Sequence, residues 1–198
     1  MQRKQFLKVI GLSVFAVSAA GFTKLSANGQ TTGTTPTTSD MLGPYFREGA
    51  PLTNDLTYPK MKGENLKVVG KLLQADGKTP IPHKIIEVWH CDHRKKYDNK
   101  SKEFRCRAKV CTDENGDYFY KTIIPPNYHW RPKHIHYLVR NIENHQELIT
   151  QLYFEGDKRI NNKTEPTHFP YDKKRILTPY KNEENITEVR LDLILTAL

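Results

Sequence analysis

The sequence lacks the features that mark membrane, fibrous and nucleotide-binding proteins. None of its apolar runs reaches the roughly 18 residues that an ordinary transmembrane helix needs. It has 11 Gly and 12 Pro among 198 residues, too few for a collagen-like or linker-dominated chain. It contains no GxGxxG, P-loop or GxSxG motif, so neither a nucleotide cofactor nor a serine nucleophile has sequence support. With 37% hydrophobic and 27% charged residues, the composition predicts one folded domain or at most two small ones.

Acidic residues are missing from the first thirty positions, which carry four of the lysines and arginines. Without those four cations the formal net charge falls from +9 to +5. This mild excess is compatible with an anionic small substrate. Because no basic segment is interleaved with aromatic residues, no nucleic acid partner is expected.

Residues 1–30 have the pattern of an export signal. A basic start at Arg3 and Lys4 precedes a mostly apolar stretch over 9–22 and then small residues, as in secretory signals. The start resembles a twin-arginine signal with Lys in place of the second Arg. We therefore expect an exported protein, periplasmic or extracellular, without stable membrane insertion after signal removal. The ordinary secretory route and an uncleaved anchor remain alternatives.

The polar run that follows predicts where the folded domain begins. Residues 31–40 are all Thr, Gly, Ser, Pro or Asp. They offer almost nothing to bury, so we expect a disordered spacer. The single folded domain is then expected over 41–198.

Cysteine is scarce, with only Cys91, Cys106 and Cys111, and no CxxC motif supports a thiolate metal site. In an exported protein the simplest arrangement is one disulfide and one free thiol. A Cys91–Cys106 pair is favoured because Cys106 and Cys111 flank one short strand, but the sequence does not fix the pairing.

From residue 66 onward the apolar pattern is short and interrupted by turn signals. Six strand-length segments rich in Val, Ile, Leu, Tyr and Phe are Leu66–Gln74, Lys84–His90, Tyr118–Thr122, Ile135–Arg140, Leu148–Phe154 and Val189–Leu195. Because no strong amphipathic helical window accompanies them, they predict an all-β fold, an antiparallel β-sandwich. Two long polar loops, over 91–109 and 155–185, are where function is expected.

The strongest chemical signal is a histidine pair beside a proline turn. His134 and His136 are two positions apart, so on a strand both imidazoles point to one face. Imidazole suits several metals, and two half-exposed histidines on an ordinary strand are the simpler reading of such a pair alone. Arg131 places a permanent cation beside the pair, and Tyr128 lies six residues before His134.

A second segment supplies another tyrosine. The apolar strand ending at Trp89 leads into a polar loop that carries Tyr97. Two phenolates with two imidazoles form a hard, anionic donor set, which favours ferric iron over Zn or Cu(I). His90, His93 and His129 lie nearby and are expected to be loop or supporting residues rather than ligands.

Further segments in the same order carry a specific resemblance. They are Leu42–Phe46, Val69-Gly70, Thr79–Pro82, Glu87–Asp92 with Tyr97, Thr112–Tyr118, Arg131–His136 and Leu148–Asp157. Together they resemble the intradiol ring-cleavage dioxygenases, a family of non-haem Fe(III) enzymes that includes protocatechuate 3,4-dioxygenase and catechol 1,2-dioxygenase. The resemblance covers about residues 41 to 160. The short interval between Tyr128 and His134 is similar to the secreted branch, and the helical N-terminal domain of the catechol enzymes is not present.

The resemblance implies a site and a reaction. The implied iron ligands are Tyr97, Tyr128, His134 and His136. The implied catalytic residues are Tyr128 as an internal base, Arg131 beside the substrate, and Gln151 close behind the metal. The implied substrates are a catechol-type ring and O2. The implied product is a muconate-type diacid, cleaved between the two hydroxyl-bearing carbons.

Other readings remain. A non-catalytic transthyretin-like β-sandwich at the cell surface would keep the fold without the reaction. A zinc or copper site on the same histidines would leave both tyrosines unexplained. Neither the particular catechol nor the oligomeric state, a homo-oligomer included, follows from the sequence.

Overall fold

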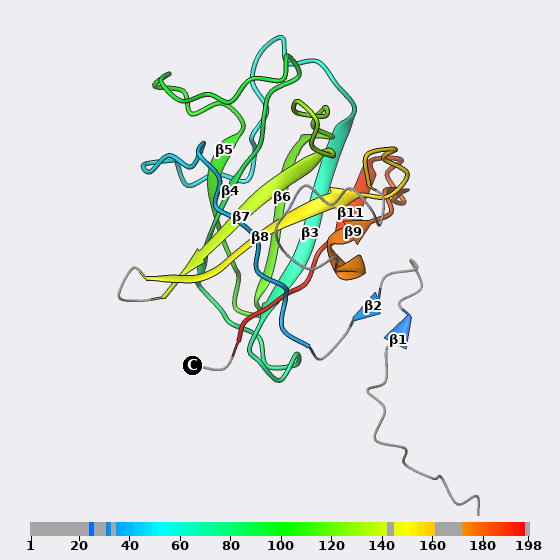
Figure 1. The fold of residues 1–198 in the computed structure, drawn as a ribbon. Coiled ribbons are helices and arrows are strands. Elements are labelled where there is room, and N and C mark those ends of the chain that lie inside the picture. The colour runs from blue at the N-terminus through cyan, green and yellow to red at the C-terminus, as the bar shows by residue number, and fades with distance from the viewer. Residues whose placement is uncertain (1–23, 26–30, 33–34, 142–144, 161–171, 197–198) are drawn as a thin grey trace, which may run out of the picture.

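The computed structural model describes residues 24–25, 31–32, 35–141, 145–160 and 172–196 (Figure 1). The expected export signal over 1–30 lies outside the described residues except for β1 (Lys24–Leu25), which pairs with β2 (Thr31–Thr32). Residues 161–171 of the second expected loop also lie outside them. Within the described residues no helix is long and apolar enough to cross a membrane, and the helical turn that they contain is the 3-10 helix η1 (Lys173–Arg175).

Two five-stranded sheets form a β-sandwich, as the sequence predicts. The first has the order β10-β11-β3-β12, with β6 on the other side of β3. Its strands are β3 (Asn65–Leu73), β6 (Asp117–Ile123), β10 (Tyr180–Lys181), β11 (Thr187–Arg190) and β12 (Leu193–Ile194). The second has the order β5-β4-β7-β8-β9. Its strands are β4 (Ile85–Trp89), β5 (Arg107–Cys111), β7 (His134–Arg140), β8 (Gln146–Phe154) and β9 (Ile176–Leu177).

The sheets are mixed rather than purely antiparallel. β11 and β12 both pair with β3 in parallel, and β9 pairs in parallel with β8. Parallel neighbours need long connections rather than tight hairpins, and these strands all come from the C-terminal part of the chain. The expected strand over 189–195 is divided between β11 and β12, and β9 and β10 lie within the second expected loop.

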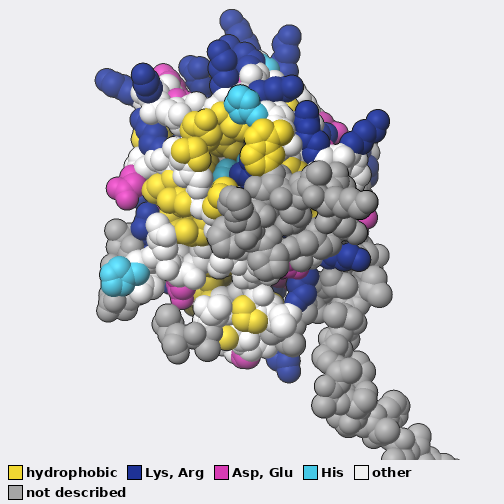
Figure 2. Space-filling model, viewed as in Figure 1, with side chains coloured by type: hydrophobic (Ala, Val, Ile, Leu, Met, Phe, Trp, Pro, Cys, Tyr) yellow, Lys and Arg dark blue, Asp and Glu magenta, His cyan; other side chains and the backbone are white. Residues whose placement is uncertain are grey.

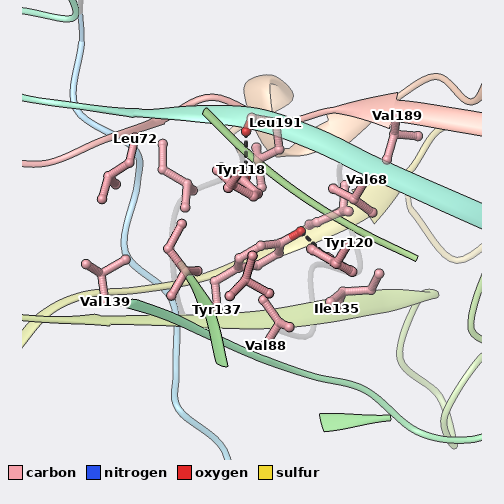
Figure 3. Packing of buried hydrophobic residues seen from close by; sticks show 14 of the residues in the cluster. Val68, Leu72, Val88, Tyr118, Tyr120, Ile135, Tyr137, Val139, Val189 and Leu191 are labelled. Atoms are coloured by element: carbon pink, nitrogen blue, oxygen red, sulfur yellow. Dashed lines mark hydrogen bonds between the residues drawn. The ribbon is translucent and has the colours of Figure 1, made fainter. Parts of the chain in front are cut away.

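The core fills the space between the sheets (Figure 3). Side chains of β3 alternate between buried and half-buried positions, and buried residues of β6 pack beside them. Three core tyrosines have hydrogen-bond partners. The hydroxyls of Tyr120 and Tyr137 lie 2.5 Å apart across the sandwich, and Tyr118 donates to the Leu191 carbonyl at 2.6 Å. A Cβ on Gly70 would meet the Leu191 oxygen at 1.8 Å, so this position of β3 requires glycine.

β7 is buried on both faces, which determines where the site can lie. Ile135, Tyr137 and Val139 point into the core. His134 and His136 point the other way because successive side chains alternate, yet each is only 2% exposed. The outer face of the second sheet is therefore covered by other parts of the chain.

The segment expected to be a disordered spacer is ordered over residues 35–40, which we call the strap. Thr37 N donates to the Ile194 carbonyl at 2.9 Å, and Asp40 N donates to the Ile149 carbonyl at 2.7 Å. The side chains of Thr37 and Asp40 are buried. Figure 1 shows this blue segment running from the C-terminal strand towards β8. Backbone pairing to β12 and β8 fixes it, although its composition offers little to bury.

The three cysteines are free, so the favoured Cys91–Cys106 disulfide is not present. Cys91 and Cys106 are both buried, and the Cys91 thiol donates to the Pro126 carbonyl at 3.6 Å. Burial raises the pKa of Cys91 to about 12 and also raises that of Cys106. Both thiols are therefore protonated at neutral pH.

Candidate metal centre

The site is built on adjacent strands of the second sheet. His136 of β7 lies between Trp89 of β4 and Gln151 of β8, and His134 lies opposite Tyr153 of β8. Because cross-strand partners share a face, these five side chains form one outward patch. The Trp89 indole stacks on the His136 imidazole, with ring centres 4.8 Å apart and planes at 4°. The sheet therefore fixes the orientation of His136.

Three donor atoms converge on this patch. The Tyr97 hydroxyl lies 3.1 Å from Nε2 of His134 and 3.1 Å from Nε2 of His136. Nδ1 of His134 lies 2.6 Å from the Pro132 carbonyl, which can only accept, so Nδ1 carries the proton and Nε2 offers its lone pair. The sequence brings these residues together through the H-x-H strand and the loop between β4 and β5.

The loop that carries Tyr97 is held by two aspartates. Asp98 Oδ1 accepts from Ser101 N at 2.9 Å and Asp98 Oδ2 from Arg105 N at 2.9 Å. Asp92 Oδ1 accepts from the backbone N–H groups of Arg94 at 2.8 Å and Lys96 at 3.0 Å. Such side chain to backbone bonds define the loop conformation. Asp92 therefore acts as a turn acceptor.

Burial sets the protonation of the three donors without a bound cation. Desolvation, aided by Arg131, lowers the pKa of His134 to about 3. Desolvation and the neighbouring His134 hold the pKa of His136 well below its usual range. Both imidazoles are therefore neutral at physiological pH, which is the ligating form. Desolvation also raises the pKa of Tyr97, against the effect of Arg131.

The arrangement fits a metal ion. Two donors each about 2.0–2.1 Å from one ion, at right angles, lie about 2.9 Å apart, close to the 3.1 Å separations here. The Tyr97 hydroxyl has one proton, so it can donate to only one of the two imidazole nitrogens beside it. Within the described chain Nδ1 of His136 has no hydrogen-bond partner. Among the described residues, no three His, Cys, Asp or Glu side chains are grouped so that they could hold a metal ion. A site here therefore depends on tyrosine.

Tyr128 lies next to this cluster but its hydroxyl is turned to another partner. The rings of Tyr97 and Tyr128 meet edge to face with centres 5.0 Å apart. The Tyr128 hydroxyl is hydrogen-bonded to that of Tyr45 at 2.6 Å. Burial, followed by this bond, raises the pKa of Tyr128 to about 12. The structure thus brings together three of the four predicted ligands, and the ring of the fourth, Tyr128, packs against that of Tyr97.

Arg131 and Gln151 lie beside the two histidines: Gln151 is the cross-strand partner of His136, and Arg131 is hydrogen-bonded to Gln151. Arg131 Nη2 donates to Gln151 Oε1 at 2.7 Å and to the Tyr153 hydroxyl at 3.2 Å. Within the described residues Arg131 Nε is buried and has no hydrogen-bond partner. The guanidinium is therefore held by one edge.

The other histidines of the region have different surroundings. His90 Nδ1 donates to the Cys91 carbonyl at 2.8 Å and its Nε2 lies 2.6 Å from the Thr122 hydroxyl. Desolvation lowers the pKa of His90 to about 4, so it is a neutral buried hydrogen-bonding residue. His93 lies 3.3 Å from the Tyr58 hydroxyl. His129 is exposed and packs against the ring of Tyr128.

Sequence reasoning missed several residues around the site. Tyr45 stacks on Tyr97 with ring centres 4.4 Å apart. Tyr153, Asp40 and Arg175 form the contacts behind Arg131. Tyr153 had one usable signal, since it lies two residues after Gln151 on the same face of a strand. The other three come from distant parts of the chain.

Cations gather at the end of the molecule that carries the Tyr97 loop. Figure 2 shows dark-blue side chains projecting from that end, where Figure 1 places the loops beyond β5. Exposed cations of the loop are Arg94, Lys95, Lys96, Lys100 and Lys102. Their field attracts anions towards this end.

The fold and the site together define an all-β sandwich in which one tyrosine and two histidines converge on the outer face of one sheet. The family model described as Dioxygenase matches residues 41–196. The chain belongs to the intradiol ring-cleavage dioxygenase family.

Three relatives illustrate the match. Catechol 1,2-dioxygenase of Acinetobacter baylyi is 32% identical over 144 residues, 58% of this chain and 45% of that protein. The protocatechuate 3,4-dioxygenase beta chain of Burkholderia cepacia is 32% identical over 127 residues, 54% of each chain. The dioxygenase domain of a carbohydrate-binding fusion protein from Streptomyces superposes with a TM-score of 0.71 at 27% identity, covering 82% of this chain and 99% of that domain. The chain spans about half the length of these two curated relatives.

Proposed function

We propose that this protein is a non-haem Fe(III) intradiol dioxygenase that cleaves a catechol-type ring with O2. The observation that carries the proposal is the convergence of the Tyr97 hydroxyl with Nε2 of His134 and His136 at 3.1 Å. Phenolate oxygen and imidazole nitrogen suit a ferric ion. Family membership supports the same reaction, since relatives carry the names of catechol and protocatechuate dioxygenases.

Tyr97, His134, His136 and Tyr128 would hold the iron. When bound, the ferric ion would supply the Lewis acidity that activates a catecholate towards O2. The N–H proton of His134 does not block metal binding at Nε2, because it is on Nδ1 and is donated to the Pro132 carbonyl. Tyr97 would bind as the phenolate, releasing its proton as the cation overcomes the effect of burial.

Tyr128 would handle a substrate proton. A catechol loses two protons when both its oxygens become anionic, and a phenolate oxygen within reach can accept one. The hydroxyl of Tyr45 at 2.6 Å gives the protonated Tyr128 a hydrogen-bond partner other than the three donors. Tyr128 can therefore take a proton and keep a hydrogen-bond partner.

Arg131 would stabilise negative charge on the ring. Its guanidinium is fixed by Gln151 and Tyr153, and a fixed cation in a water-poor site costs no reorganisation during the reaction. The bond between the two hydroxyl-bearing carbons breaks and each carbon gains one oxygen atom of O2. The product is a muconate-type diacid, and the atoms balance without a further reductant.

The direct test is cleavage of catechol by the iron-loaded protein under isotopically heavy O2, with mass analysis of the product. The proposal expects a ring-opened diacid that contains both heavy oxygen atoms. A product with one heavy atom, or no product from iron-loaded protein across several catechols, would contradict it. We also propose export of the protein on the basis of residues 1–30, which cell fractionation tests.

A further inference from the structure

A buried ion pair is connected to Arg131 through the side chains of Gln151 and Tyr153. Arg175 Nη1 donates to Asp40 Oδ2 at 2.5 Å, and the two side chains are 2% and 0% exposed. Arg175 ends η1 and Asp40 ends the strap, 135 residues apart. Desolvation often offsets the attraction within a buried ion pair, so such a pair is weak evidence for a role in stability. Its remaining contacts indicate another role.

Asp40 determines which way the Gln151 amide faces. Gln151 Nε2 donates to Asp40 Oδ1 at 3.2 Å and to the Met41 carbonyl at 3.1 Å. Both partners can only accept, so the NH2 group faces the strap and Oε1 faces Arg131. Gln151 Oε1 then accepts from Arg131 Nη2 at 2.7 Å. A reversed amide would place N–H donors against the guanidinium.

Tyr153 provides a second connection between Asp40 and Arg131. Its hydroxyl lies 3.0 Å from Asp40 Oδ2 and 3.2 Å from Arg131 Nη2. The hydroxyl has one proton, and it donates to the carboxylate because that is the strongest acceptor nearby. The oxygen is then free to accept from Arg131. The Arg175 guanidinium also lies over the Tyr153 ring, 5.5 Å from its centre.

We propose that Asp40 and Arg175 are positioning residues that hold the Arg131 guanidinium beside the metal site. Asp40 orients both acceptors of Arg131 Nη2, and Arg175 holds the Asp40 carboxylate in place through the buried ion pair. Asp40 lies one residue before the segment that the family model matches. The effect on turnover rests on the proposed function, whereas the orientation of Arg131 does not.

The test compares Asp40→Asn, an isosteric change that removes the charge, with Tyr153→Phe, which removes one connection. Glu147→Gln is the matched control, since it breaks the Lys84–Glu147 pair (2.8 Å) towards the other end of β8. Arg131→Leu, alone and combined with Asp40→Asn, reports coupling. The measurements are iron content, melting temperature, kcat and KM for catechol, and arginine side-chain nitrogen NMR of the metal-free protein, with the Arg131 signals assigned by their loss in Arg131→Leu.

We expect Asp40→Asn to keep its iron and to lower kcat by about ten- to a hundredfold, the effect of losing hydrogen bonds to a charged group. KM should change less. In the Arg131→Leu background the same change should have almost no effect. The separate Nη signals of Arg131 should merge in Asp40→Asn, because the guanidinium rotates freely, and should stay separate in Glu147→Gln.

The proposal would be overturned by wild-type kcat per iron in Asp40→Asn, or by an effect of equal size in the Arg131→Leu background. Unchanged Arg131 signals would do the same. If Asp40→Asn does not fold, Tyr153→Phe carries the test with a smaller expected loss. If the wild-type protein does not cleave catechol, the proposed function fails, and the Arg131 signals alone decide whether Asp40 positions that residue.

Discussion

The hydroxyls of Tyr45 and Tyr128 are hydrogen-bonded at 2.6 Å, although the residues are 83 positions apart. The Tyr45 ring also stacks on Tyr97, with the two planes at 11°. Three tyrosines therefore pack against one another on the covered face of the second sheet. The Tyr128 ring therefore lies against Tyr97, while its hydroxyl is hydrogen-bonded to Tyr45.

Replacing Tyr45 by Phe removes the partner of Tyr128 and keeps the stacked ring. We expect iron to stay bound and kcat for catechol to fall about tenfold, because a mispositioned base contributes less to proton transfer. The pKa of Tyr128 should also move back towards its ordinary value. Tyr180→Phe is the control, since its hydroxyl binds Glu188 on the other sheet. Wild-type kcat in Tyr45→Phe would exclude this role.

Replacing Tyr97 by Phe should abolish iron retention and colour. The change removes the oxygen that lies 3.1 Å from both imidazoles and leaves two neutral nitrogens and Tyr128 for a ferric ion. His134→Gln should have the same result. His93→Gln should keep its iron, because His93 is hydrogen-bonded to the Tyr58 side chain and packs against its ring. A coloured, active Tyr97→Phe protein would refute the assignment of this ligand.

Replacing Arg131 by Leu should leave iron bound and slow turnover by about a hundredfold or more, the typical effect of one lost charge-stabilising donor. Arg131 lies close enough to lower the pKa of His134 without being one of the predicted ligands. Steady-state kinetics and iron analysis of the same sample separate the two effects. Turnover equal to wild type would contradict the role given to Arg131.

The metal-free protein should begin to lose stability at pH values well above those at which carboxylates are protonated. Burial lowers the pKa of His90 to about 4 and that of His134 to about 3, from 6.5. The unfolded chain therefore binds more protons below about pH 6.5, and stability falls as pH falls. Each such histidine should contribute about 1.4 kcal/mol per pH unit.

Urea unfolding at about pH 7 and about pH 5 measures this loss. A variant with His90→Gln should lose less stability between the two, by the share of one histidine. An unfolding free energy that is the same at both pH values would show that these imidazoles are not buried in the neutral form.

The cationic loop should favour anionic catechols. The exposed Lys95 and Lys96 lie just before Tyr97, and surface charge acts mainly on encounter with a charged substrate. Changing both to Glu should lower kcat/KM for a carboxylated catechol by about threefold or more at low salt and leave an uncharged catechol unaffected. Lys121→Glu, an exposed change on β6, is the control. Equal losses for both substrates would contradict an electrostatic role.

Local patterns predicted much of this molecule. Alternating apolar segments located the principal strands, and the two-residue spacing of His134 and His136 placed both imidazoles on one face of β7. The expected sandwich is confirmed. Parallel pairing of β9, β11 and β12 was not predicted, because strand direction depends on how distant segments meet rather than on their composition.

The contacts behind the site could not be predicted for the same reason. Asp40 meets Arg175 across 135 positions, and no periodicity or spacing relates them. The polar strap was expected to be disordered because it buries little apolar surface. Backbone hydrogen bonds to β8 and β12 order it instead, and they bring Asp40 beneath Gln151.

The central claim is that Tyr97, His134 and His136, with Tyr128, form a ferric site for a catechol. The most direct measurement is the visible absorption spectrum of the iron-loaded protein before and after anaerobic addition of catechol. We predict a wine-red band from tyrosinate-to-Fe(III) charge transfer that shifts when catechol is added. A protein that stays colourless after Fe(III) loading and catechol addition would contradict the claim and favour a binding module without this chemistry.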